Sequence, residues 1–187
     1  MKKIILSTLI LFALSGCKKE SQKADDLTAS PDSASMVENT DSENATYALP
    51  EIAPENIGKY LAQNNDTLYV TNFFATWCGP CIREIPHFKN KMAELKGKPV
   101  KFTFVNLDEK SDWNSVVKKF TDENGLSENT VLLDGKRLDQ NFFPKNFQKW
   151  DGGSIPFTYM RKGNKTDEYL GMMTEDVLTS KINSFIK

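Results

Sequence analysis

Residues 67–81 read Thr67-Leu68-Tyr69-Val70-Thr71-Asn72-Phe73-Phe74-Ala75-Thr76-Trp77-Cys78-Gly79-Pro80-Cys81. The first eight form a largely apolar run, which is typical of a buried central strand. From Cys78 to Leu95 the apolar spacing is that of a helix, and Gly97 and Pro99 end it. A strand, then two cysteines separated by two residues, then a helix is the setting of a redox-active dithiol rather than of a zinc site.

The two cysteines are not equivalent in this setting. Cys78 lies at the predicted helix N-terminus, where free backbone N–H groups and the helix dipole stabilise a thiolate, so we expect it to be the attacking nucleophile. Cys81 lies one turn further on, close enough to form a disulfide, and is expected to be the resolving thiol. Pro80 is tolerated in the first helical turn and makes it rigid. A static disulfide is the alternative, but a bridge across so short a loop contributes little stability.

Predicted strands and helices alternate along the rest of the chain, and a hairpin and a helix close it. This order is typical of an α/β sheet flanked by helices. The other predicted elements are a short helix or irregular entry at 54–62, strands at 100–107 and 130–133, a helix at 112–124 that Gly125 ends, a helical stretch at 136–150 interrupted by Pro144, hairpin strands at 155–160 and 165–170, and a helix at 174–186.

Three features together resemble the thioredoxin superfamily: the segment from Phe73 to Cys81, Pro86 five residues later, and Gly153-Ser154-Ile155-Pro156 downstream. Within the superfamily, the exported and anchored TlpA/ResA-like thiol-disulfide oxidoreductases are most similar, and the resemblance covers residues 54–187. It implies a thioredoxin-like α/β fold with a central mixed β-sheet flanked by helices. It also implies a TlpA/ResA-type insertion, with an extra strand and helix between residues 112 and 150.

The resemblance further implies roles for single residues around the disulfide. Trp77, Gly79 and Pro80 belong to the active-site loop. The Ile155–Pro156 peptide bond is expected to be cis, with Pro156 stacked against the disulfide. The backbone of Ile155 then pairs with an extended substrate chain, as in strand addition. A plain trans proline at the start of a strand is the alternative for Pro156.

One position departs from cytoplasmic thioredoxins. These carry a buried Asp six residues before the nucleophile, where this chain has Asn72, which cannot titrate. Several TlpA/ResA-like proteins instead use a Glu three residues after the second cysteine, here Glu84, on the same helix face as Cys81. We predict that Glu84 accepts the proton of Cys81 and that partial burial raises its pKa; a solvated glutamate is the alternative. His87 is expected to be a surface or packing residue.

The N-terminus has the pattern of an export signal. Met1-Lys2-Lys3 is basic, and the apolar run from Ile4 to Leu14 is too short to cross a bilayer. Leu14-Ser15-Gly16-Cys17 resembles a bacterial lipoprotein signal, which implies cleavage after residue 16 and acylation of Cys17. An ordinary secretory signal with a free thiol is the alternative. Lys18, rather than Asp, follows Cys17, which by the same resemblance favours the outer membrane over the inner membrane.

Residues 18–50 differ in composition from the rest. They include seven acidic residues, a single aromatic residue, Tyr47, and no hydrophobic period. We expect a disordered tether that holds a folded domain away from the membrane. The predicted organisation is a signal peptide at 1–16, a lipidated cysteine and tether at 17–50, and a thioredoxin-like domain at 51–187.

Composition excludes several classes of function. The 24 basic and 25 acidic residues give a net charge of −1, without the excess of positive charge that nucleic-acid binding needs, so DNA and RNA are not expected partners. Three cysteines and one histidine cannot form an all-cysteine or two-cysteine, two-histidine zinc site. We expect no metal and no bound cofactor, only a redox-active Cys78–Cys81 disulfide.

Together these patterns predict a periplasm-facing envelope lipoprotein that exchanges thiols and disulfides with other envelope proteins. It would receive electrons from an upstream redox protein. A Gly-Pro pair between the cysteines resembles thioredoxin, which is reducing, and therefore favours a reductase that acts on apocytochrome c or on misoxidised proteins. An oxidase or isomerase is the first alternative. A non-catalytic thioredoxin-fold binding or chaperone module is the second.

Overall fold

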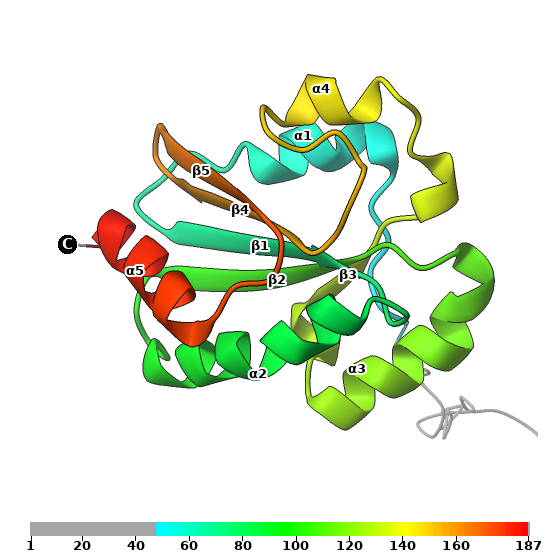
Figure 1. Ribbon diagram of the computed structural model, residues 1–187, viewed down its shortest axis with the longest axis horizontal. Coiled ribbons are helices and arrows are strands. Elements are labelled where there is room, and N and C mark those ends of the chain that lie inside the picture. Colours follow the sequence, from blue (N-terminus) through cyan, green and yellow to red (C-terminus); the bar gives the residue numbers. More distant parts are fainter. Residues whose placement is uncertain (1–47, 187) are drawn as a thin grey trace, which may run out of the picture. The chain divides into compact units, whose positions relative to one another are not determined.

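The computed structural model describes residues 48–186, and this part contains one five-stranded sheet (Figure 1). The strands lie in the order β3-β2-β1-β4-β5. Strand β2 pairs in parallel with β1 and β3, whereas β4 pairs antiparallel with β1 and β5, so the sheet is mixed, as predicted. The strands are β1 (Leu68–Phe74), β2 (Val100–Asn106), β3 (Thr130–Leu132), β4 (Phe157–Lys162) and β5 (Lys165–Leu170).

Helices cover both faces of this sheet, which confirms the predicted α/β architecture. Helices α2 and α5 lie on one face, and α1 and α4 lie on the other (Figure 1). The helices are α1 (Ile57–Leu61), α2 (Gly79–Glu94), α3 (Lys118–Asn124), α4 (Phe142–Asn146) and α5 (Glu175–Ile186). Single 3-10 turns occur at Pro54–Asn56, Lys110–Asp112, Ser127–Asn129 and Gly135–Arg137, and a π-helical turn at Trp113–Val117.

Strand β1 is apolar on both sides because both faces of the sheet are covered. Phe74 faces the core beneath α2, where its ring contacts that of Phe104. Phe73 faces the opposite core, against Phe147 and Trp150. The chain passes from the end of β1 to the start of α2 in four residues, so the two cysteines lie at the carboxyl edge of the parallel strands.

The predicted helical stretch at 136–150 is wrong in extent. Only the turn Gly135–Arg137 and the short helix α4 are helical there. Pro144 does not interrupt a helix; it lies in the first turn of α4, where its missing N–H has no partner to lose. Phe147 then leaves the helix in an extended conformation and packs into the core, so tertiary packing ends the helix early.

The segment between β2 and β4 supplies the expected extra helix and strand. After the π-helical turn, α3 ends at Gly125, whose φ of 65° is the left-handed conformation predicted for this stop. The chain then forms the edge strand β3, and Leu132 packs with Trp113 and with Leu49 in a small separate cluster. Glu51, which lies outside any strand, forms an isolated parallel bridge with Leu132 of β3, so ordered packing already includes the residues just before α1.

The predicted signal peptide, the lipidation site Cys17 and nearly all of the predicted tether lie outside the described residues. Within 48–186, no helix is both long enough and apolar enough to cross a membrane. The lipid anchor therefore stays a prediction from the sequence.

Candidate active site

Cys78 and Cys81 form a disulfide at the start of α2, with their Cα atoms 5.3 Å apart. Cys78 is the N-cap residue of α2, and the backbone N–H of Cys81 donates to its Sγ at 3.3 Å. This N–H group and the helix dipole favour a thiolate on Cys78 once the disulfide is reduced. The structure thus brings the two predicted cysteines together and gives Cys78 the environment of a nucleophile.

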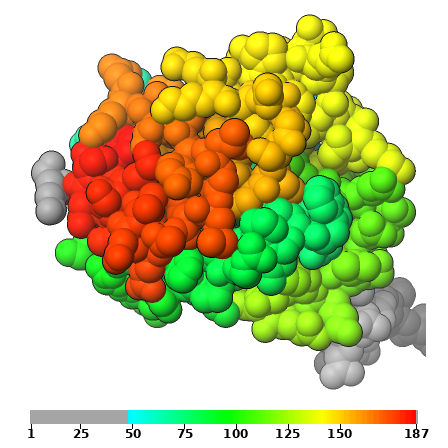
Figure 2. All heavy atoms as spheres, viewed as in Figure 1, coloured from blue at the N-terminus to red at the C-terminus, as the bar shows by residue number. Residues whose placement is uncertain are grey.

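Only Cys78 of the pair opens onto a groove, which has a volume of about 840 Å³. Cys81 is fully buried in the core beneath the sheet. Trp77, Gly79 and Pro80 also line the groove, and Trp77 is 71% exposed. The start of α2 reaches the surface between the segment that leads into β4 and the helices that follow β2 (Figure 2). A substrate sulfur can therefore approach Cys78 but not Cys81.

The Ile155–Pro156 peptide bond is cis, as the resemblance implied. The carbonyl oxygen of Ile155 lies 3.7 Å from Sγ of Cys78, and Ile155 lines the groove. The carbonyl oxygen of Pro156 accepts a hydrogen bond of 2.8 Å from the backbone N–H of Gly171. Backbone, rather than a bulky side chain, therefore lies directly beside the reactive sulfur.

A buried carboxylate holds the turn before Cys78. Asp108, which follows β2, accepts hydrogen bonds from the backbone N–H (2.8 Å) and the hydroxyl (2.5 Å) of Thr76. The side chain of Asn106 donates to the same carboxylate at 2.6 Å, and the indole N–H of Trp113 donates to the carbonyl oxygen of Asp108 at 3.0 Å. The sequence analysis did not single out Asp108. Its position just after a strand parallel to β1 could have indicated it, because functional residues gather at the carboxyl ends of such strands.

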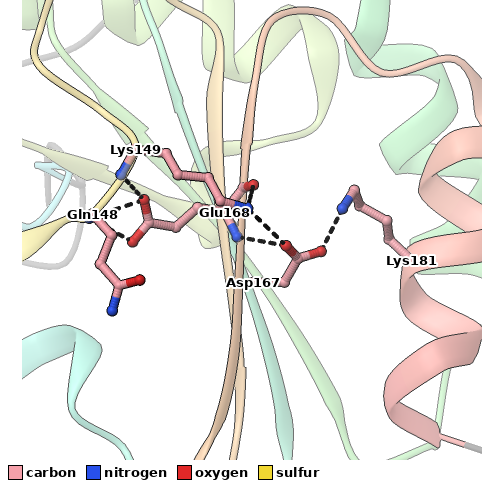
Figure 3. A network of polar contacts seen from close by, with 5 residues as sticks. All are labelled: Gln148, Lys149, Asp167, Glu168 and Lys181. Carbon is pink, nitrogen blue, oxygen red and sulfur yellow. Dashed lines mark hydrogen bonds and ion pairs between the residues drawn. The ribbon is translucent and has the colours of Figure 1, made fainter.

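A second carboxylate, that of Glu168 on β5, holds the chain at Gln148 and Lys149 (Figure 3). It accepts hydrogen bonds from the backbone N–H groups of Gln148 (2.9 and 3.1 Å) and Lys149 (2.6 Å). The next residue, Trp150, lines the groove and stacks on Phe157 with ring centroids 4.4 Å apart. These contacts hold the segment before the cis peptide bond against the sheet.

Glu84 lies fully buried, one helical turn beyond Cys81. Its Oε1 accepts a hydrogen bond from the side-chain amide of Asn72, and its Oε2 accepts one from the backbone N–H of Met173, both at 2.7 Å. Burial raises the pKa of Glu84 from 4.5 to about 7, and the two hydrogen bonds oppose this rise only in part. The pKa of Glu84 is therefore raised, as predicted. Its side chain is completely rather than partly buried, and the alternative of a solvated glutamate is wrong.

Asn72 connects this carboxyl group to the sheet. Its Nδ2 also donates to the hydroxyl of Thr158 on β4, at 3.1 Å. Its Oδ1 is buried and has no hydrogen-bond partner among residues 48–186. No pattern in the sequence pointed to Thr158 or Met173. Thr158 reaches Asn72 only through the pairing of β4 with β1, and Met173 reaches Glu84 only through the position of the loop after β5.

His87 lies away from the groove. Its ring is about one-third exposed and lies 3.7 Å from the carboxylate of Glu175 on α5, which is the packing role that the sequence predicted. In the described part of the chain, no group of three or more His, Cys, Asp or Glu side chains is arranged to bind a metal ion.

Known proteins are similar to this chain in sequence and in fold. The family model named Thioredoxin matches residues 49–121. The thiol-disulfide oxidoreductase ResA of Oceanobacillus iheyensis is 30% identical over 161 residues, which cover 79% of this chain and 78% of that protein. The sporulation thiol-disulfide oxidoreductase A of Bacillus subtilis is 27% identical over 150 residues, which cover 78% and 88% respectively.

A solved structure of a thioredoxin-family thiol:disulfide interchange protein from Chlorobium tepidum has the same fold. Its TM-score is 0.55 at 20% identity, over 70% of this chain and 85% of that one. The similarity to ResA extends over more than three quarters of both sequences, and the Cys78–Cys81 disulfide agrees with the reaction in that relative's name. The chain belongs to the ResA-like thiol-disulfide oxidoreductases of the thioredoxin superfamily.

Proposed function

We propose that this enzyme reduces disulfide bonds in exported proteins at the bacterial cell envelope, with Cys78 as the nucleophile and Cys81 as the resolving thiol. The observation that carries this assignment is the unequal access of the two sulfurs: Cys78 lines the groove, whereas Cys81 is buried behind it. A substrate disulfide can thus be attacked from the groove, while the second sulfur is kept for the internal step.

The reaction transfers two electrons from the dithiol to the substrate. The Cys78 thiolate attacks one sulfur of the substrate disulfide, which releases the other sulfur as a thiolate and leaves a mixed disulfide. The Cys81 thiolate then attacks Sγ of Cys78, which frees the second substrate sulfur and forms the Cys78–Cys81 disulfide. An upstream redox protein must return two electrons by the same exchange before the next cycle.

Glu84 is proposed to accept the proton of Cys81 before the resolving attack. A carboxyl group with a pKa of about 7 is half ionised at neutral pH, which is the condition under which a base is effective. Its position one turn beyond Cys81, on the helix face that points into the core, supports this role. Asn72 and Met173 hold the carboxyl group in place.

The groove is proposed to take an extended stretch of the substrate chain. The backbone of Ile155 would pair with it beside Cys78, and Pro156 in its cis form would keep that backbone exposed to the substrate. Trp77, Gly79 and Pro80 supply the facing wall of the groove. Recognition through backbone groups suits an enzyme that acts on many different disulfides.

The sequence supports the proposed location. The pattern at Leu14 to Cys17 indicates a lipoprotein, anchored by acylation of Cys17 and facing the periplasm, and Lys18 favours the outer membrane. Substrates would then be envelope proteins with disulfides, among them apocytochrome c. The electron donor would be another envelope redox protein.

The reduction potential of the Cys78–Cys81 pair tests the direction of the reaction. We expect a value below about −240 mV at pH 7 after equilibration with defined dithiol buffers, as in thioredoxin. A value above about −180 mV would contradict reduction and favour the alternative of an oxidase or isomerase. Reduction of a protein disulfide that survives in Cys78→Ser would instead favour a binding or chaperone module with an incidental dithiol.

A further inference from the structure

A second groove, of about 800 Å³, begins at the active site and leads away from the cis peptide bond. Trp77 is the only residue that lines both grooves. Val116, in the π-helical turn, lines the second groove together with Trp77 and with Phe120 of α3. The ring of Phe120 packs on Phe74 of β1, with centroids 5.9 Å apart, so the base of this groove is continuous with the core.

The walls of the second groove are unusually exposed for apolar residues. In the described part of the chain, Trp77 (71%) and Val116 (50%) have the largest exposed fractions of all large hydrophobic side chains. Neither belongs to a packed core. Two such side chains that line one groove beside a reactive sulfur are typical of an interaction surface.

Asp108 fixes both segments that carry the apolar walls of the second groove before any ligand binds. Asp108 binds the backbone N–H and the hydroxyl of Thr76, directly before Trp77. Its carbonyl oxygen accepts the indole N–H of Trp113, at the start of the π-helical turn that carries Val116. Turns of this kind occur often at functional sites. A groove with fixed walls loses little entropy when it is filled.

The charged residues that line the second groove do not favour a charged ligand. Lys119 and Glu123 are the ionisable side chains that line the groove, and they face each other as an exposed pair with 3.9 Å between Nζ and Oε1. Their charges cancel, while the surface between Trp77 and Val116 is apolar. An uncharged aliphatic or aromatic side chain therefore fits this groove best.

We propose that the groove between Trp77 and Val116 is a specificity subsite that takes an apolar side chain from the same polypeptide whose cysteine reacts with Cys78. The proposal rests on the proposed exchange with polypeptide substrates. The two grooves are continuous at Trp77, the residue before Cys78, which lines both of them. Disulfide exchange requires that the substrate contact Cys78, so the substrate lies beside the second groove. A chain bound in the first groove therefore continues over Trp77 into the second.

Synthetic peptides can test this subsite without knowledge of the natural substrate. Each peptide has one cysteine, joined to glutathione as a mixed disulfide, in a Gly/Ser background. A single Phe is moved from four residues before the cysteine to four residues after it. The pre-reduced protein is mixed with each peptide, and the second-order rate constant of a single turnover is measured. We expect Phe on one side of the cysteine to raise this constant about tenfold over the matched Ser peptide.

The ratio of the Phe to the Ser rate constant is then measured in variants. Val116→Asp and Val116→Lys should both bring this ratio close to one, because neither charge can be buried beside an apolar ring. Ile186→Asp is the matched control: Ile186 is also an exposed apolar helix residue (37%), but it lies near the C-terminus of α5, and the ratio should stay at about tenfold.

The outcomes separate two failures. If the protein reacts with none of the peptides, the proposed function itself is wrong. If it reacts with all peptides but shows no preference for Phe, or keeps the preference in both Val116 variants, the subsite is wrong and the proposed exchange stands. A preference that arises in the first groove would survive the Val116 substitutions and so would also overturn the subsite.

Discussion

Glu84 places an ionisable side chain in the core, where desolvation disfavours its charged form. Two N–H donors, from Asn72 and Met173, favour the carboxylate, but the desolvation outweighs them and the pKa rises to about 7. Near neutral pH the proton is therefore held weakly enough to be exchanged. We therefore expect the stability of the protein to depend on pH through this residue, and its chemistry as well if Glu84 has the proposed role.

Stability should fall as pH rises through the range in which Glu84 loses its proton. The folded protein keeps this proton up to about pH 7, whereas the unfolded chain releases it near pH 4.5, so folding binds a proton between these values. This contribution of about 3 kcal/mol is present below pH 4.5 and lost as pH approaches and passes 7. Glu84→Gln should flatten the change measured by urea denaturation at pH 5 and pH 8.

Asn72 can adapt to that substitution, because its unpartnered Oδ1 can turn to accept from the new amide. Glu128→Gln, at an exposed position, is the control and should keep the wild-type slope. A wild-type slope in Glu84→Gln would mean that another group is responsible.

Glu84→Gln should also slow the resolving step. With no base beside Cys81, the mixed disulfide between Cys78 and a substrate should persist at least about tenfold longer at pH 7. The dependence of its decay on pH should then follow the Cys81 thiol alone. Rapid quenching with acid, followed by mass spectrometry, measures the decay. Decay with an unaltered rate and pH profile would remove Glu84 from the proton path.

Three irregular segments are each held by a carboxyl group. Asp108, two residues after β2, holds the turn before the cysteines, and Glu168 on β5 holds the segment before the cis bond (Figure 3). Glu84 on α2 holds the loop after β5 through Met173. A carboxyl group can accept hydrogen bonds through both of its oxygens, so one such side chain can give a loop a fixed geometry.

Replacement of Glu168 should loosen one of these segments. In Glu168→Gln only one oxygen remains to accept from Gln148 and Lys149, and we expect a loss of about 1–3 kcal/mol in the free energy of unfolding. Hydrogen exchange at these two N–H groups should become faster.

Asp167→Asn is the matched control, because the neighbouring Asp167 forms ion pairs with Lys149 and Lys181 rather than with that backbone (Figure 3). Asp167→Asn should lower the free energy of unfolding by less than about 1 kcal/mol. Equal effects of the two substitutions would show that Glu168 acts only through its charge.

Residues 48–186 have two main cores, one on each face of a single sheet. Strands β1, β2 and β4 contribute side chains to both cores. Because the two cores share these strands, loss of packing in one core also disturbs the strands that carry the other. Phe147 lies at the centre of an aromatic group in the second core, with ring contacts to Phe73, Trp150, Phe157, Tyr159 and Phe142.

Phe147→Ala should lower the free energy of unfolding by about 3–5 kcal/mol through the cavity it leaves. Because the sheet is shared, unfolding should stay a single transition in which circular dichroism and tryptophan fluorescence change together. Urea denaturation followed by both probes measures this. Two separated transitions would show that the cores unfold independently.

The sequence by itself determined the elements whose signals are local. An apolar run predicted β1, periodic spacing predicted α2, and Gly125 predicted the end of α3. The cysteine spacing, read in that context, predicted the redox pair. Such signals reach only a few residues along the chain, and they are readable because backbone geometry limits which side chains share a face.

Tertiary structure alone decided which distant residues hold the turn before Cys78 and the carboxyl group of Glu84. Asp108 binds a residue 32 positions away and Glu84 binds one 89 positions away, and no local pattern encodes either pair. The same holds for the helical stretch expected at 136–150, which ends early because Phe147 is more stable in the core than in a longer helix. Packing against distant strands gains more than local helix propensity, so these features became visible only once the sheet was assembled.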